Sequence, residues 1–167
     1  MLARNNPDFD KILLTIEISE GGWAYLTLRD AENEETLRIS HIFDGIERLV
    51  TAILLLNKGI QTTECTLFSE PGGYYILFER KSPEIVTIKI YETERWTDMP
   101  LKDVIHKSTT LFITACKLKQ LNNQFINALH TLLQEYSIEE YKRRWHNEFP
   151  TRKYAELQQF VKTDAQI

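Results

Sequence analysis

Hydrophobic and polar residues alternate along three stretches near the start of the chain, which is the period of a half-buried β-strand. The stretches are 11–19, 23–29 and 36–40, and the turn residues Gly21-Gly22 separate the first two. The apolar positions of the first two stretches are Ile12, Leu14, Ile16, Ile18, Ala24, Leu26 and Leu28. The pattern predicts an antiparallel β-meander with one dry face.

A second meander is predicted over residues 63–91. Its strand-forming stretches are 65–68, 74–78 and 85–90, separated by the turn residues Pro71-Gly72-Gly73 and Lys81-Ser82-Pro83. In the last stretch, Val86, Ile88 and Ile90 alternate with more polar residues. These three side chains are therefore expected to point into a core.

Two long stretches change to the helical period, with apolar residues three and four positions apart. These stretches are 42–57 and 119–136. Gly59 follows the first of them, at the place where a left-handed C-cap is expected.

The remaining segments are shorter. The charged stretch 92–102 is predicted to be a loop, and the β-branched residues of 107–118 predict a seventh strand. Ser137 and Glu140 form a capping-box pattern that predicts the start of a short helix. A last helix is predicted over 151–162.

Together these elements predict one α+β domain over residues 1–167, with residues 1–10 as a loose leader. We expect a single, mostly antiparallel sheet of about six or seven strands. The two long helices are expected to cover one face of that sheet, accompanied by the short C-terminal helices.

The composition is that of a globular protein that needs no disulfide or metal to hold its core. The longest uninterrupted aliphatic run, 52–56, is far shorter than the roughly 20 residues of a membrane span, and the first ten residues lack the apolar core of a signal peptide. The two cysteines, Cys65 and Cys116, lie in apolar, strand-like surroundings and form no disulfide framework. We therefore expect a cytoplasmic protein that does not contact a membrane.

The net charge of −4 is unevenly distributed. Residues 1–100 contain 17 acidic and 10 basic side chains, whereas residues 101–167 contain 7 acidic and 10 basic ones. An acidic, sheet-rich part favours a basic protein partner over nucleic acid, because phosphate binding needs clustered Lys and Arg. The alternative is that these charges only keep the fold soluble.

No motif predicts catalysis, a metal or another cofactor. The glycine pairs lie between strands, away from any strand-to-helix junction that would cradle a phosphate. The histidines are scattered, without the spacing of zinc ligands: His41, His106, His130 and His146. Buried thiols are inert, and the paired carboxylates fall in loops or on exposed helix turns. A non-enzymatic protein is expected, with a small enzyme of unidentified type as an alternative.

The basic run 142–144 lies between Tyr141 and Trp145. Aromatic and basic residues together can bind single-stranded nucleic acid. On a helix, however, Tyr141 and Trp145 are four residues apart and share one face. We interpret them as core residues beside a solvated face, so no nucleic-acid partner is expected.

A candidate partner-binding site follows from the alternation in the two meanders. If the apolar faces point inward, Trp23, Tyr25 and Tyr91 point outward onto one open sheet face, with Glu17 beside them. Aromatic rings supply contact area that is desolvated on binding, and carboxylates speed the encounter with a basic partner. Alternatively, the C-terminal helices cover this face and the rings belong to the core.

The helix 43–59, the following stretch Glu70-Pro71-Gly72-Gly73-Tyr74-Tyr75, and the closing pattern Tyr141, Trp145 and Phe149-Pro150 give the chain a family resemblance. Residues 36–150 resemble small immunity proteins of bacterial polymorphic toxin systems. The resemblance implies a cytosolic, non-enzymatic protein that binds and blocks one toxin domain. In size, acidity and make-up the chain is also similar to secretion chaperones for effector proteins, which is the second hypothesis.

Overall fold

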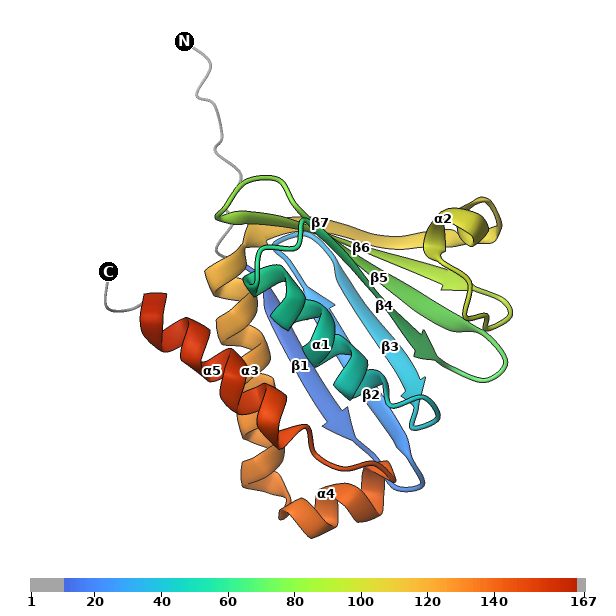
Figure 1. Cartoon of the computed structure of the whole chain (residues 1–167). Coiled ribbons are helices and arrows are strands. Elements are labelled where there is room, and N and C mark those ends of the chain that lie inside the picture. Colours follow the sequence, from blue (N-terminus) through green and yellow to red (C-terminus); the bar gives the residue numbers. More distant parts are fainter. Residues whose placement is uncertain (1–10, 165–167) are drawn as a thin grey trace.

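The computed structural model describes residues 11–164 (Figure 1). The strands are β1 (Leu13–Ile18), β2 (Trp23–Arg29), β3 (Glu34–Ser40), β4 (Thr62–Phe68), β5 (Gly73–Arg80), β6 (Ile85–Thr93) and β7 (Thr109–Lys117). The helices are α1 (Gly45–Asn57), α2 (Leu101–Val104), α3 (Leu118–Glu135), α4 (Ile138–Trp145) and α5 (Thr151–Asp164), and a 3₁₀ turn, η1, spans Ile105–Lys107. The leader expected at residues 1–10 lies outside the described residues.

The strands form two antiparallel sheets, and the prediction of one sheet of about six or seven strands is therefore wrong. One sheet has the order β1-β2-β3 and the other β4-β5-β6-β7. The chain leaves β3, passes through α1 and only then enters β4. Because no tight turn joins β3 to β4, nothing local forces these two strands to pair. The predicted strands themselves are confirmed, and each meander forms its own sheet (Figure 1).

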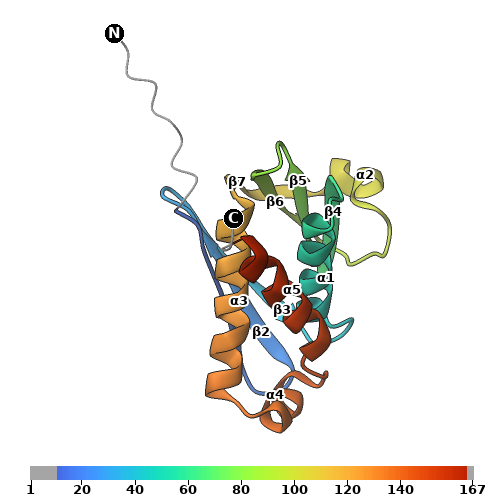
Figure 2. The ribbon, with the colours of Figure 1, turned by 60° about the vertical axis from the view of Figure 1, so that its left-hand side comes forward.

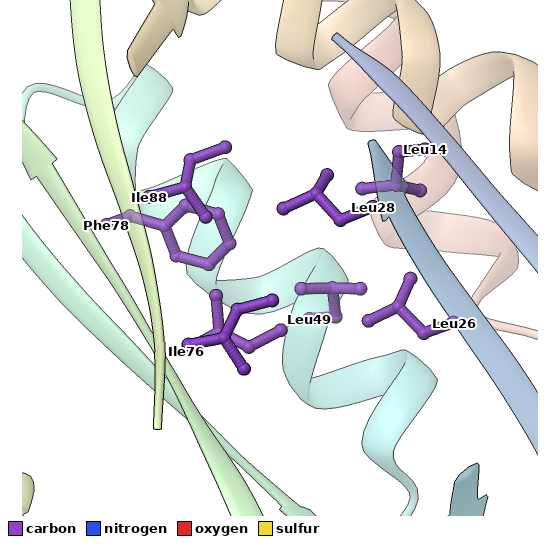
Figure 3. Close-up of a pocket in the computed structure, with 8 residues that line it drawn as sticks. Leu14, Leu26, Leu28, Leu49, Ile76, Phe78 and Ile88 are labelled. Atoms are coloured by element: carbon purple, nitrogen blue, oxygen red, sulfur yellow. The ribbon is translucent and has the colours of Figure 1, made fainter. Parts of the chain in front are cut away.

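The apolar faces of the two sheets look toward each other across a shared core. Figure 3 shows leucines of β1 and β2 opposite apolar residues of β5 and β6, with Leu49 of α1 beside them. All of these side chains belong to one buried cluster that also includes residues of α3, α4 and α5. The two sheets are therefore the walls of one hydrophobic core.

The helices α1, α3, α4 and α5 all contribute side chains to this core. α1 contacts β4, α3 contacts β1, and α5 lies between α1 and α3 (Figure 2). The side chains of α1 and α3 that face inward are fully or almost fully buried. None of the described helices is long and apolar enough to cross a membrane.

The helix ends are fixed by side chains. Ser137 Oγ accepts a hydrogen bond from the Glu140 backbone N–H at 3.1 Å, which confirms the predicted cap of α4. The first helix begins at Gly45, later than its apolar period suggests. The reason is that Phe43 and Asp44 have left-handed backbones, with φ of 67° and 35°. Asp44 then caps α1 by accepting from the Glu47 backbone N–H at 3.3 Å.

Part of the outer face of the four-stranded sheet, around Tyr75 and Tyr91, is covered by a segment that was predicted to begin as a loop. α2 and η1 follow β6, and Leu101 and Val104 of α2 pack on Tyr75 and Tyr91. Within residues 11–164, no helix packs on the outer face of the three-stranded sheet (Figure 2). The two outer faces therefore differ in their exposure to solvent.

Candidate protein-binding face

We use the term bare face for the outer face of the three-stranded sheet. Its residues alternate with the core residues of the same strands: Thr15, Glu17, Trp23, Tyr25, Thr27, Arg29, Glu34, Thr36 and Arg38. None of these residues is buried, whereas their neighbours Ile16, Ala24, Leu26 and Leu37 are at most 5% exposed. The strict alternation holds the bare face on a rigid wall of the core.

The centre of the bare face is one cross-strand row. Glu17 of β1 lies opposite Tyr25 of β2, which lies opposite Arg38 of β3. Tyr25 is 36% exposed. The Arg38 guanidinium carbon lies over the Trp23 ring, 3.5 Å from its centroid, in a cation–π contact. Trp23, Tyr25 and Glu17 are therefore brought together, as predicted from the alternation.

Arg38 was not identified from the sequence, although the alternation in β3 contains the signal. Glu34, Thr36 and Arg38 share one face of that strand, and Leu37 and Ile39 share the other. The bare face also contains Arg29, whose Nη1 is 3.6 Å from Glu34 Oε2. Charges of both signs surround the aromatic rings, in place of the expected ring of carboxylates.

Tyr91 does not lie on the bare face, and its predicted grouping with Trp23 and Tyr25 is wrong. It belongs to β6 of the other sheet and is only 8% exposed. Its side chain does point away from the shared core, but there it packs with Tyr75 beneath α2. Tyr91 is separated from the other rings by the division into two sheets and is covered by the α2 segment. Alternation along a strand can predict neither feature.

The C-terminal helices leave the bare face open. Tyr141 and Trp145 are fully buried in the shared core, which confirms their interpretation as core residues. The basic run between them is paired with carboxylates, because Arg143 contacts Glu20 and Glu140 at 3.0 and 2.6 Å. Arg144 also contacts Glu140 and Glu20, and Lys142 contacts Glu148.

A second exposed aromatic group lies at one end of the four-stranded sheet and was not predicted. Phe43 stacks on Trp96 with ring centroids 4.3 Å apart, and Phe68 meets both rings edge-on. Phe43 is 47% exposed and is held outward by its left-handed backbone. A surface pocket of about 330 Å³ beside Trp96 is lined in part by Arg95 and Lys107. This group differs from the bare face in that two of its three rings, Phe43 and Trp96, lie in loops, and only Phe68 lies in a strand.

The described residues offer little catalytic geometry. The space between the two sheets is about 10 Å³, at the lower limit for a single water molecule (Figure 3). Burial raises the pKa of the Cys65 and Cys116 thiols to about 12, so neither is a thiolate at neutral pH. His41 and His146 meet edge-on at 4.6 Å, but no group of three metal-ligating side chains occurs within residues 11–164.

No known family model and no curated protein matches this chain. Among solved structures, a chain of the CdiA-CT/CdiI toxin and immunity complex from Enterobacter cloacae is similar, with 10% sequence identity. The match covers 74% of this chain and 97% of that chain, with a TM-score of 0.43. A likeness at this level is too low to establish a common fold or a function.

Proposed function

We propose that this chain is a non-enzymatic cytosolic protein that binds and blocks a toxin domain, and that it does so through the bare face. The observation that carries the proposal is the uncovered sheet face with Trp23, Tyr25 and Arg38 at its centre. The resemblance of residues 36–150 to small immunity proteins supports a toxin domain as the partner.

The chemistry of the bare face suits a protein partner. Trp, Tyr and Arg are the residue types that most often dominate binding energy at protein interfaces. Here they stand on a three-stranded sheet whose other face is core, so little backbone order is lost on binding. Glu17 and Arg38 place a negative and a positive charge at opposite ends of the central row. A partner with complementary charges would therefore bind in one orientation.

The test begins with the gene next to the one for this chain, which the proposal expects to encode a toxin domain; that domain is purified and titrated against the wild type. Trp23→Ala should weaken binding by about 2 kcal/mol, or roughly 30-fold, because the indole and the platform for Arg38 are lost together. Glu17→Gln should mainly slow association at low salt. Ile138→Ala is the matched control, since Ile138 is an exposed apolar residue on α4, at 47% exposure, and should not change affinity.

Two results would count against this proposal. Full-strength binding by folded Trp23→Ala would remove the bare face as the binding site. Failure of the wild type to protect cells that express the neighbouring toxin domain would remove the immunity function. If the neighbouring gene encodes a secreted effector in place of a toxin domain, the secretion-chaperone hypothesis replaces it.

A further inference from the structure

Two open sheets have four edge strands, and three of these edges are covered within the described residues. The β1 edge is covered by α3. Gln124 Oε1 accepts from the Leu14 backbone N–H at 3.2 Å, and Gln120 Nε2 donates to the Ile12 carbonyl at 3.4 Å. Tyr136 donates its hydroxyl hydrogen to the Ile18 carbonyl at 3.3 Å. These side chains satisfy backbone groups that would otherwise be free to pair with another strand.

The β3 and β4 edges are covered by each other and by α1. Ser69 Oγ, directly after β4, donates to the Arg38 carbonyl of β3 at 2.6 Å. α1 lies along β4, and Thr63 Oγ1 of β4 donates to the Ala52 carbonyl of α1 at 3.2 Å. β3 contacts β4, and β4 also contacts α1, so each of these edges has a neighbour within the described residues.

The β7 edge is different. β7 is nine residues long and pairs only with β6, as the outermost strand of its sheet (Figure 1). Within residues 11–164, no group outside the sheet forms a hydrogen bond with the backbone of residues 109–116. The strand has no proline, and its one charged residue is Lys117 at its end. Ile113, in the middle, is 56% exposed, more than any other large hydrophobic residue described.

The unpaired N–H and C=O groups of a strand edge are satisfied by another extended strand. We infer that this edge is the site at which two copies of the chain associate, with β7 of one copy antiparallel to β7 of the other. A two-fold axis at Ile113 would place each Ile113 beside the Ile113 of the second copy and would hold the two Lys117 side chains at opposite ends of the pair, with the register shift of β7 at residues 110–112 to one side of the axis. No like charges then face each other across the pair, so the strand is complementary to itself.

The covered edges also explain why the assembly would stop at two copies. Once the two β7 edges are joined, the remaining edges of each copy are those covered by α1, α3 and Ser69. An open-ended stack of strands is therefore blocked. The dimer would contain one continuous sheet of eight strands, twice the four of each copy.

Analytical ultracentrifugation of the full chain over a range of concentrations tests this inference. The wild type should shift reversibly from the mass of one chain to that of two. Ile113→Lys, which places two lysines side by side, should raise the dimer dissociation constant at least about tenfold. Ile138→Lys, a matched exposed isoleucine on α4, should leave the dissociation constant unchanged.

A cross-linking experiment locates the contact. Cys65 and Cys116 are at most 2% exposed, so a short bis-maleimide should react only with an introduced thiol. Ile113→Cys should give a cross-linked dimer, and Ile138→Cys should not. A wild type that stays monomeric at its highest soluble concentration, a dimer unaffected by Ile113→Lys, or growth beyond two copies would each overturn the inference. None of these results depends on the toxin-binding proposal.

Discussion

The outer faces of the two sheets are built from the same kind of strand, but their central tyrosines differ in exposure to solvent. On the three-stranded sheet, Tyr25 lies at the centre of the face and is 36% exposed. On the four-stranded sheet, Tyr75 occupies a comparable place opposite Tyr91 and is 2% exposed. The difference comes from α2, which packs on Tyr75 but has no counterpart on the bare face within the described residues.

The covered tyrosine is also tied to the chain by its hydroxyl group. Tyr75 donates its hydroxyl hydrogen toward the Met99 and Thr97 carbonyls, at 2.7 and 3.2 Å. Burial raises the pKa of this hydroxyl, with a further contribution from Glu64 and Asp98. Glu64 in turn accepts from the Leu101 backbone N–H at 3.2 Å, at the start of α2. The tyrosine on one outer face is therefore part of the packed fold, whereas the tyrosine on the other outer face is exposed to solvent.

The largest expected effect is on the covered face. Tyr75→Ala should lower the free energy of unfolding by about 3–5 kcal/mol, because it removes a buried ring and leaves a cavity under α2. Tyr75→Phe keeps the ring and should cost about 1 kcal/mol, the contribution of the hydroxyl hydrogen bonds. Urea denaturation measures both. A loss below about 1 kcal/mol for Tyr75→Ala would mean that α2 does not cover this face in solution.

A smaller effect on stability is expected at one end of the three-stranded sheet, where ion pairs connect α4 to the turn between β1 and β2. Hydrogen bonds from Arg143 and then Arg144 lower the pKa of Glu140 from 4.5 to about 2. Arg143 also contacts Glu20 in the turn between β1 and β2. Because the folded pKa is the lower one, this stabilisation is present above pH 4.5 and is lost as the pH falls toward 2.

The measurement is the melting temperature of the wild type and of Glu140→Gln between pH 2 and 6. The wild type should be the more stable protein near pH 6, and the two curves should converge as the pH falls through the window of the Glu140 pKa. Added salt should shrink the difference, since the ion pairs lie at the surface. A constant difference at all pH values would show that Glu140 acts by packing alone.

Periodicity predicted the elements of this fold well, because each strand or helix presents its own apolar face to the core. It located all seven strands and the long helices, and Ser137 identified the start of α4. It could not predict the division into two sheets. Whether β3 and β4 pair depends on the packing of α1, which connects them, and the sequence of neither strand records it.

Local alternation predicted part of the candidate site, and the unpredicted division into two sheets explains the error in the rest. Trp23, Tyr25 and Glu17 lie on two strands joined by a tight turn, so local alternation was sufficient to group them. Grouping Tyr91 with them required knowing the sheet to which β6 belongs. Its burial required knowing that α2, a helix of four residues, folds back over it.

The smallest expected effect on stability is on the bare face itself. Tyr25→Ala should lower the free energy of unfolding by less than about 1 kcal/mol, because Tyr25 is 36% exposed and forms no part of the buried core. Tyr75→Ala is measured in the same way by urea denaturation. Both substitutions remove a tyrosine ring from the middle of a strand, so the difference between their losses gives the stabilisation that comes from packing under α2. A loss for Tyr25→Ala that matches the loss for Tyr75→Ala would mean that the bare face is covered in solution. The toxin-binding proposal would then have no exposed aromatic anchor at the centre of the three-stranded sheet.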